Sequence, residues 1–221
     1  MRRAFDRRVA PDAALDLVRA CRSFADCHLG GGLALSGAYL GHRLSADADL
    51  VFHDADALRA LVADLPEVSR RVGLGLEVVQ DGRTFVRARV DGLPGLARLD
   101  LTLESGGDLA PPEQLEGIAV ESLVDLRVAK LTCLLSRSEP RDLVDLLFLD
   151  RAGQPPEQDL SLALRRDSGI DPGVLAWLLG QFPVRPLPQM LEPLTEAELE
   201  RFRDELRERL RRVAVPRTPT A

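Results

Sequence analysis

Residues 30–52 decide the fold, and they read GGGLALSGAYLGHRLSADADLVF. A short apolar run precedes the glycines and an Ala/Leu segment follows them, which predicts a strand, a glycine turn and a short helix. The stretch ends in two aspartates and the apolar residues 50–52, which predict a second short strand at 49–52.

The same stretch carries the chemistry. Asp47 and Asp49 are two positions apart, so on an extended chain their carboxylates emerge on one face. Hard divalent cations take such oxygen ligands and keep positions open for phosphate oxygens, while a glycine turn entering a helix forms an anion site. A third carboxylate on a neighbouring strand would complete a site for nucleotidyl transfer. Asp100 is the first candidate, with Glu104 and Asp108 as weaker substitutes.

The rest of the chain indicates a mixed sheet first and helices after. Helices are expected at 11–27 and from Asp54 to about 71, where Pro66 would end the second one early. Asp-Gly pairs at 81–82 and 91–92 separate three alternating segments in 75–104, which predicts an antiparallel meander. A loop at 105–117 follows. The later helices are predicted at 122–137, 140–150, 157–167, 172–181 and 195–213, with a frayed end at 216–221.

Composition excludes several classes of protein. The apolar fraction is 45% and the charged fraction 29%, and no apolar stretch is long enough to span a bilayer, so no membrane contact is expected. The charged start lacks the apolar run of a secretory signal, which favours the cytoplasm. The three cysteines form no C-x-x-C pair and no partnered histidine spacing, so they predict buried apolar side chains and neither disulfides nor a structural zinc site.

Charge also limits the partners. The net charge of -6 means that nucleic acid could bind only at a local basic patch. Two arginine groups are candidates, although a solvated face explains each as well: the strand face at 83, 87 and 89, and the last helix, where interspersed acids favour ion pairs. One Trp and one Tyr offer few stacking platforms for bases. A single lysine, Lys130, stands among 28 arginines.

These motifs resemble a known family. The two glycines, the D-x-D pair and the distant aspartate resemble the polymerase-beta-type nucleotidyltransferase superfamily. The closer resemblance is to the AbiEii/AbiGii toxin nucleotidyltransferases, and three blocks in the correct order carry it: Gly31-Gly32-Leu33-Ala34-Leu35; Gly41-His42-Arg43-x-Ser45-x-Asp47-x-Asp49-x-x-Phe52; and Lys130-x-x-Cys133-x-x-x-Arg137 with Arg141-Asp142-x-x-Asp145-Leu146. Leu33, Cys133 and Arg141 depart from the usual residues, which bears on nucleotide affinity more than on the fold.

The resemblance implies an α+β fold, with a nucleotidyltransferase core at 1–117 and a C-terminal helical domain at 118–221. It implies an NTP substrate and Mg²⁺ or Mn²⁺ as cofactor. The implied roles are metal binding and catalysis by Asp47, Asp49 and Asp100; nucleotide binding by Gly31, Gly32, Arg43, Ser45, Lys130 and Arg137, with Lys130 also catalytic; and structural support by His42, Asp142 and Asp145.

Plainer readings of these residues stay open at this point. The D-x-D pair could be a polar turn, Asp100 a solvent-facing residue of an edge strand, and Lys130 a solvated helix residue. His42 and Arg43 could only cap the short helix at its C-terminus. Arg137, Asp142 and Asp145 could form an ion-pair network that pins two helices together.

Together the residues and the resemblance predict a metal-dependent enzyme that moves an NMP from an NTP to an acceptor. The resemblance suggests the 3′ end of tRNA as acceptor, a role as a toxin in a toxin-antitoxin or phage-defence system, and a cognate antitoxin as partner. Nucleotidylation of a small molecule or a protein is the first alternative, which the acidic net charge favours. A non-catalytic binding module with the same fold is the second.

Overall fold

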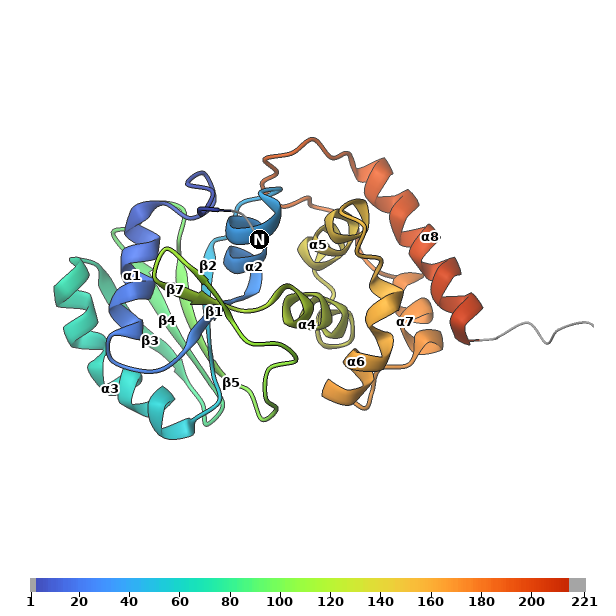
Figure 1. The fold of residues 1–221 in the computed structure, drawn as a ribbon. Coiled ribbons are helices and arrows are strands. Elements are labelled where there is room, and N and C mark those ends of the chain that lie inside the picture. Colours follow the sequence, from blue (N-terminus) through green and yellow to red (C-terminus); the bar gives the residue numbers. More distant parts are fainter. Residues whose placement is uncertain (1–2, 215–221) are drawn as a thin grey trace, which may run out of the picture. The chain divides into compact units, whose positions relative to one another are not determined.

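The computed structural model describes residues 3–214 of the chain (Figure 1). The chain has an α+β fold and divides into two compact units, the first reaching Leu126 and the second starting at Arg127. The predicted frayed end at 216–221 lies outside the described residues.

A seven-stranded mixed sheet forms the frame of the first unit. Its strands are β1 (His28–Gly30), β2 (Asp47–Phe52), β3 (Gly75–Asp81), β4 (Phe85–Asp91), β5 (Arg98–Leu103), β6 (Glu113–Leu115) and β7 (Ile118–Val120). They lie in the order β3-β4-β5-β2-β1-β7-β6. The pairs β2/β5 and β1/β7 are parallel and the other neighbours antiparallel. The predicted meander is therefore confirmed as β3-β4-β5, and β2 and β5 lie inside the sheet.

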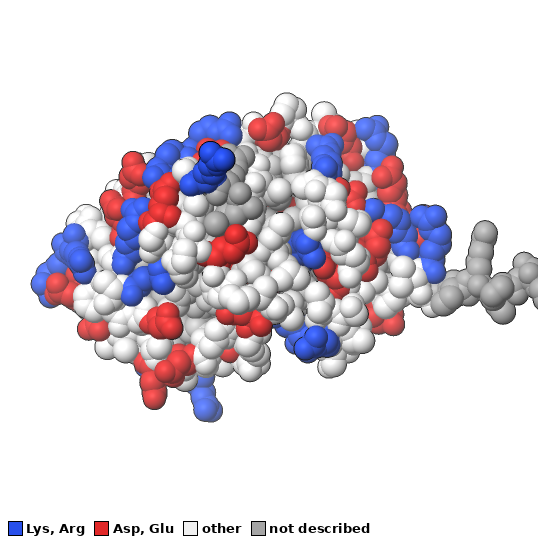
Figure 2. Space-filling view, viewed as in Figure 1, with Lys and Arg blue, Asp and Glu red and all other residues white. Residues whose placement is uncertain are grey.

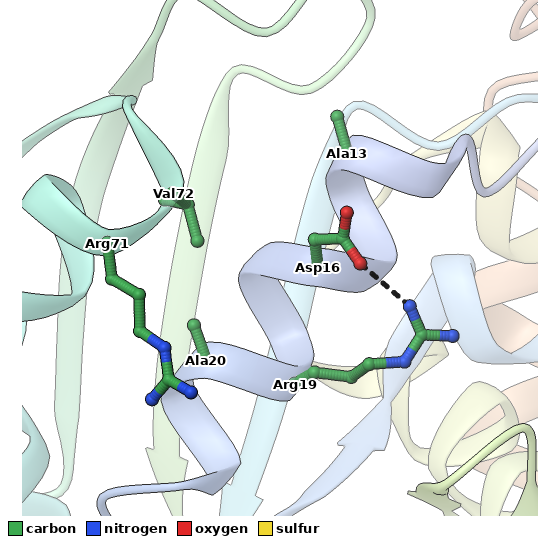
Figure 3. Close-up of a pocket in the computed structure, with 6 residues that line it drawn as sticks. All are labelled: Ala13, Asp16, Arg19, Ala20, Arg71 and Val72. Carbon is green, nitrogen blue, oxygen red and sulfur yellow. Dashed lines mark hydrogen bonds and ion pairs between the residues drawn. The ribbon is translucent and has the colours of Figure 1, made fainter.

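Two amphipathic helices, α1 (Asp12–Arg22) and α3 (Ala55–Val72), contact the strands from one side (Figure 1). Both bury an apolar stripe at helical spacing, and the sheet contributes the alternate residues Ala48, Leu50, Leu99 and Leu101, all fully buried. A surface hollow of about 400 Å³ lies between the two helices, beside the Asp16–Arg19 ion pair (Figure 3). None of the predicted site residues lines it.

The prediction that Pro66 ends the second helix early is wrong. Helix α3 runs through this proline to Val72, and Asp54 caps its start by accepting a hydrogen bond from the Asp56 amide at 2.9 Å. The buried leucine stripe continues past the proline to Val68. Burial of that stripe outweighs the one helical hydrogen bond that a proline removes.

The predicted loop at 105–117 also needs correction. Its last residues form β6, which turns back into β7 at Glu116 and Gly117, both with positive φ. Strand β7 pairs with β1 through Leu29 and Val120, so this hairpin belongs to the sheet. The prediction placed the domain boundary after residue 117, whereas the two units meet after Leu126 because the hairpin completes the first.

The second unit is helical, as predicted. It comprises α4 (Leu123–Ser136, starting just before the boundary), α5 (Pro140–Arg151), a 3-10 turn (Pro156–Asp159), α6 (Leu160–Arg166), α7 (Pro172–Leu179) and α8 (Glu196–Ala214). Helix α8 packs against α5 and α7 and buries residues 199, 202, 206 and 210. Arg203 and Arg211 pair with acidic residues one or three positions away on the same helix, whereas Arg209 pairs with Asp150 of α5. Within residues 3–214, no helix combines the length and apolarity needed to cross a bilayer.

Candidate active site

The parallel pairing of β2 and β5 brings the predicted aspartates together. Asp49 is directly opposite Asp100, and Asp47 is directly opposite Arg98. Directly opposed residues of neighbouring strands point to the same side of a sheet, and strand spacing is about 5 Å. The three carboxylates therefore share one face and one region of the sheet. Asp100 is 5% exposed on an inner strand, so its reading as a solvent-facing edge residue is wrong.

Two arginines balance the charge of these aspartates. Arg98 donates to both carboxylate oxygens of Asp47, at 2.6 and 2.8 Å, and Arg87 on β4 donates to both oxygens of Asp100, at 2.8 and 2.7 Å. These hydrogen bonds raise the pKa of both guanidinium groups above the ordinary value for arginine. Sequence reasoning missed Arg98, although its place two residues before Asp100 puts it on the same strand face.

The glycine turn lies against Asp49. Gly31 starts the short helix α2 (Gly31–Ala34) with a φ of +64°, and a Cβ added there would lie 1.9 Å from Asp49 Oδ2. A π-helical turn (Leu35–Leu40) continues the segment. Glycine is thus required at position 31 twice, for its backbone conformation and for the space that the carboxylate occupies.

Polar side chains converge on Gly32 as well. A Cβ added there would lie 2.8 Å from Arg43 Nη2 and 2.9 Å from Ser45 Oγ. Arg43 is 2% exposed and donates to the Leu44 carbonyl at 2.9 Å, while Ser45 donates to the Asp47 carbonyl at 3.2 Å. His42 and Arg43 are both buried, at 0% and 2% exposed. The missing side chain of Gly32 leaves room for the polar groups of Arg43 and Ser45 beside its backbone.

The second unit holds the remaining predicted residues. Lys130 on α4 is 4% exposed, with Nζ at 2.8 Å from Asp145 Oδ2 and 3.3 Å from Asp142 Oδ1 on α5. Arg137 binds both oxygens of Asp142, at 2.8 and 2.9 Å. Burial lowers the pKa of Arg137, but the hydrogen bonds and charge of Asp142 outweigh it and raise that pKa overall. The ion-pair network that the sequence left open therefore exists, and Lys130 is not a solvated helix residue.

A further group of metal-binding side chains lies elsewhere in the first unit. Among residues 3–214, three His, Cys, Asp or Glu residues bring donor atoms within 4.8 Å of one another only at His28, His53 and Asp108. Asp108, a weaker candidate for the third carboxylate, thus pairs with histidines. Two of the strand arginines have different partners. Arg87 binds Asp100, whereas Arg89 binds Glu77 and Asp91.

Comparison with known proteins places the chain in a family. Residues 16–218 match the family described as nucleotidyl transferase AbiEii toxin, type IV TA system. The chain belongs to this AbiEii family. It is accordingly a nucleotidyltransferase of the toxin type, which sets the non-catalytic alternative aside and confirms the resemblance seen in the sequence. None of the curated proteins matches the chain.

Solved structures show the same fold as this AbiEii family member. JHP933 from Helicobacter pylori is 18% identical, with a TM-score of 0.52 over 93% of this chain and 94% of that chain. A second H. pylori structure is 17% identical, with a TM-score of 0.57 over 93% and 96%. MenT4, the nucleotidyltransferase toxin Rv2826c from Mycobacterium tuberculosis H37Rv, is 19% identical, with a TM-score of 0.52 over 91% and 85%. At these identities the likeness concerns the fold alone.

Proposed function

We propose that this AbiEii-family chain transfers an NMP from an NTP to the 3′ end of tRNA in a reaction that depends on Mg²⁺ or Mn²⁺. The observation that carries the proposal is the alignment of Asp49 with Asp100, with the Asp49 carboxylate against the Gly31 turn. It puts oxygen ligands beside backbone amides, which is the pairing that a metal-bound triphosphate needs.

The donor set fits a hard divalent cation. Asp47, Asp49 and Asp100 offer only carboxylate oxygens, and they lie on one face of two adjacent strands. Within the described residues, Arg98 pairs with Asp47 and Arg87 pairs with Asp100. These carboxylates therefore already bind cationic groups. When bound, Mg²⁺ or Mn²⁺ would lower the pKa of the attacking hydroxyl and offset the charge of the departing pyrophosphate.

The other residues position the nucleotide in this proposal. The amides of Gly31 and Gly32 would bind phosphate oxygens beside Arg43 and Ser45. The buried Arg43 guanidinium provides a fixed positive charge there. Lys130 on α4 and Arg137, which directly follows that helix, are held by Asp142 and Asp145, and the resemblance alone supports their contact with the nucleotide.

The acceptor and partners rest on the family. A type IV toxin implies a cognate antitoxin, and we propose the cytoplasm as location because NTPs and tRNA are found there. Nucleotidylation of a small molecule or a protein remains the second candidate, and the net charge of -6 favours it. In the view of Figure 2, basic and acidic side chains are interspersed, which gives a polyanion no broad basic surface on that face.

Label transfer tests the proposal. Purified protein is incubated with Mg²⁺, each α-labelled NTP in turn and total cellular RNA, beside an Asp49→Asn variant and an Asp56→Asn control. Asp56 is an exposed residue of α3, away from the aspartate face. We expect label in tRNA-sized RNA with wild type and the control, and at least a 1,000-fold lower rate with Asp49→Asn, corresponding to about 4 kcal/mol. Label in protein or in a small product would show that tRNA is not the acceptor. No transfer with any NTP would contradict the proposal.

A further inference from the structure

His28, His53 and Asp108 come from three separate segments. His28 starts β1, His53 directly follows β2, and Asp108 lies in the connection between β5 and β6. Asp108 Oδ1 is 2.9 Å from His53 Nε2 and 3.6 Å from His28 Nε2, and the two imidazole rings are 5.5 Å apart between centroids. The two histidines are 25 positions apart in the sequence, which is not the short spacing that indicates a pair of metal ligands. Only the pairing of β1 with β2 brings them together.

The distances suit a small metal ion. Ligands at about 2.1 Å from a tetrahedral zinc ion are about 3.4 Å from each other. The distances from Asp108 Oδ1 to the two imidazole nitrogens, 2.9 and 3.6 Å, lie on either side of that value. Two imidazoles and one carboxylate, with a fourth position open to water, form a common ligand set for Zn²⁺.

His28 supplies the independent observation. Its side chain is 6% exposed, and its Nε2 is buried without a hydrogen-bond partner while lying on the side of Asp108. A buried polar nitrogen without a partner costs about 1–3 kcal/mol, and a metal ion would satisfy it. Burial lowers the pKa of His28 below its ordinary value and outweighs the negative charge of Asp108, which raises it, and the neutral imidazole is the form that ligates a metal.

The cluster is separate from the aspartates. His53 is four residues beyond Asp49 along an extended strand, which puts their Cα atoms about 13 Å apart. His28 pairs with Val51, two residues away along β1 from the Gly30–Asp49 pair. No residue is shared between the two sites, and an ion at one could not be ligated by the other.

We propose that His28, His53 and Asp108 form a binding site for a divalent transition-metal ion of the Zn²⁺ class, distinct from the carboxylate site for the nucleotide. The ion links the segment after β5 to the start of β1 and the end of β2. Because the ligands are two nitrogens and one oxygen, the site prefers Zn²⁺ over Mg²⁺.

The test uses the full chain after treatment with a chelator, titrated with Zn²⁺ against a competing indicator. The chain has three histidines, so imidazole ¹⁵N resonances report directly on the site. We expect one equivalent of Zn²⁺ to shift the signals of His28 and His53 and to leave those of His42 unchanged. We also expect the unfolding temperature to rise with Zn²⁺ concentration.

Ligand variants decide the assignment. His53→Gln changes a side chain that is 34% exposed, and Asp108→Asn keeps its shape, so both variants should fold. Each should weaken Zn²⁺ binding by about 100-fold, since even loss of an indirect ligand contact costs 10–100-fold. Asp56→Asn and Cys133→Ala, which serve as controls, should bind Zn²⁺ as wild type does. Unshifted His28 and His53 signals, or wild-type affinity in His53→Gln and Asp108→Asn, would overturn the proposal.

Discussion

Asp47 and Arg98 lie directly opposite each other in the parallel strands β2 and β5, and the guanidinium of Arg98 donates to both carboxylate oxygens of Asp47. Asp47 is 5% exposed, so this pair is shielded from water on the carboxylate side. The arginine thus occupies the oxygens that a metal ion would need. Arg98 and the cation compete for one carboxylate in the mechanism proposed above.

This competition predicts the effect of Arg98→Gln on metal affinity. Removing one positive charge a few ångströms from a cation site is worth about 1 kcal/mol where water screens the pair, so Mg²⁺ should bind about fivefold more tightly. Calorimetric titration with Mg²⁺, or spin-resonance titration with Mn²⁺, measures it. Arg89→Gln is the matched control because Arg89 pairs with Glu77 and Asp91 instead. Weaker binding in Arg98→Gln would show that the arginine orders Asp47 for the metal.

Gly31 offers a second prediction, with a control of similar backbone conformation. Gly31→Ala puts a methyl group where Asp49 Oδ2 lies and keeps a φ of +64°, whereas Gly73→Ala has a φ of +69° and nothing within 4 Å of the added carbon. Both variants should lose about 1–2 kcal/mol of stability from the left-handed conformation. Only Gly31→Ala should lose activity, by about 100-fold, because it displaces a carboxylate by an ångström or more. Label transfer and thermal unfolding of both variants check this, and equal activities would contradict it.

The local patterns predicted much of the first unit. Asp-Gly turns and alternation predicted β3, β4 and β5, and the apolar residues 50–52 predicted a strand at 49–52, within β2, because these signals depend on neighbours in sequence. The strands β6 and β7 were missed because each has three residues, too few to show a period. The predicted end of the helix at Pro66 is wrong because local helix preference does not include the buried apolar stripe, which continues past this proline.

The residues of the candidate sites also differ in how well the sequence predicts them. The aspartates and glycines lie in one short stretch or at a recognisable motif, so their identity could be predicted. The pairing of Asp47 with Arg98, and that of His28 with Asp108, depend on strand register and chain topology over 50 residues or more. No local pattern encodes those partners, although Arg98 shares its strand face with Asp100.

The cysteines give a third prediction. Burial raises the pKa of the Cys27 thiol to about 12, and it raises the pKa of Cys21 and Cys133 as well. Less than a hundredth of such a thiol is ionised at pH 8, and the thiolate is the reactive form. We therefore expect no rapid reaction of Cys21 or Cys27 with a disulfide reagent at pH 8 in the native protein, and three reactive thiols in denaturant. A fast thiol in the native protein, assigned to Cys21 or Cys27, would show that α1 opens.

The buried network around Lys130 predicts a stability effect that separates its structural role from a catalytic one. Lys130 and Arg137 carry two positive charges, and Asp142 and Asp145, both fully buried, carry two negative ones. Lys130→Met would remove the ammonium from the buried Asp145 carboxylate, and removal of one member of a buried ion pair costs about 3–5 kcal/mol. Chemical unfolding of the variant measures this loss.

The identity of the residue matters as well as its charge. The Lys130 ammonium lies between two carboxylates, at 2.8 and 3.3 Å, and 4% of the residue is exposed. An arginine fork is larger and planar, so Lys130→Arg would overpack this space and lose about 1–3 kcal/mol while keeping the charge. This explains why the one lysine of an arginine-rich chain stands here.

The control and the double variant make the prediction decisive. Arg211→Ala removes an exposed ion pair with Glu208 and should change stability by about 1 kcal/mol or less. Lys130→Met combined with Asp145→Leu removes both charges of one pair, so its loss should be well below the sum of the two single variants. Additive losses would mean that Lys130 and Asp145 are not coupled. If Lys130→Met instead keeps full stability and loses label transfer, the ammonium acts on the nucleotide alone and the network does not hold α4 to α5.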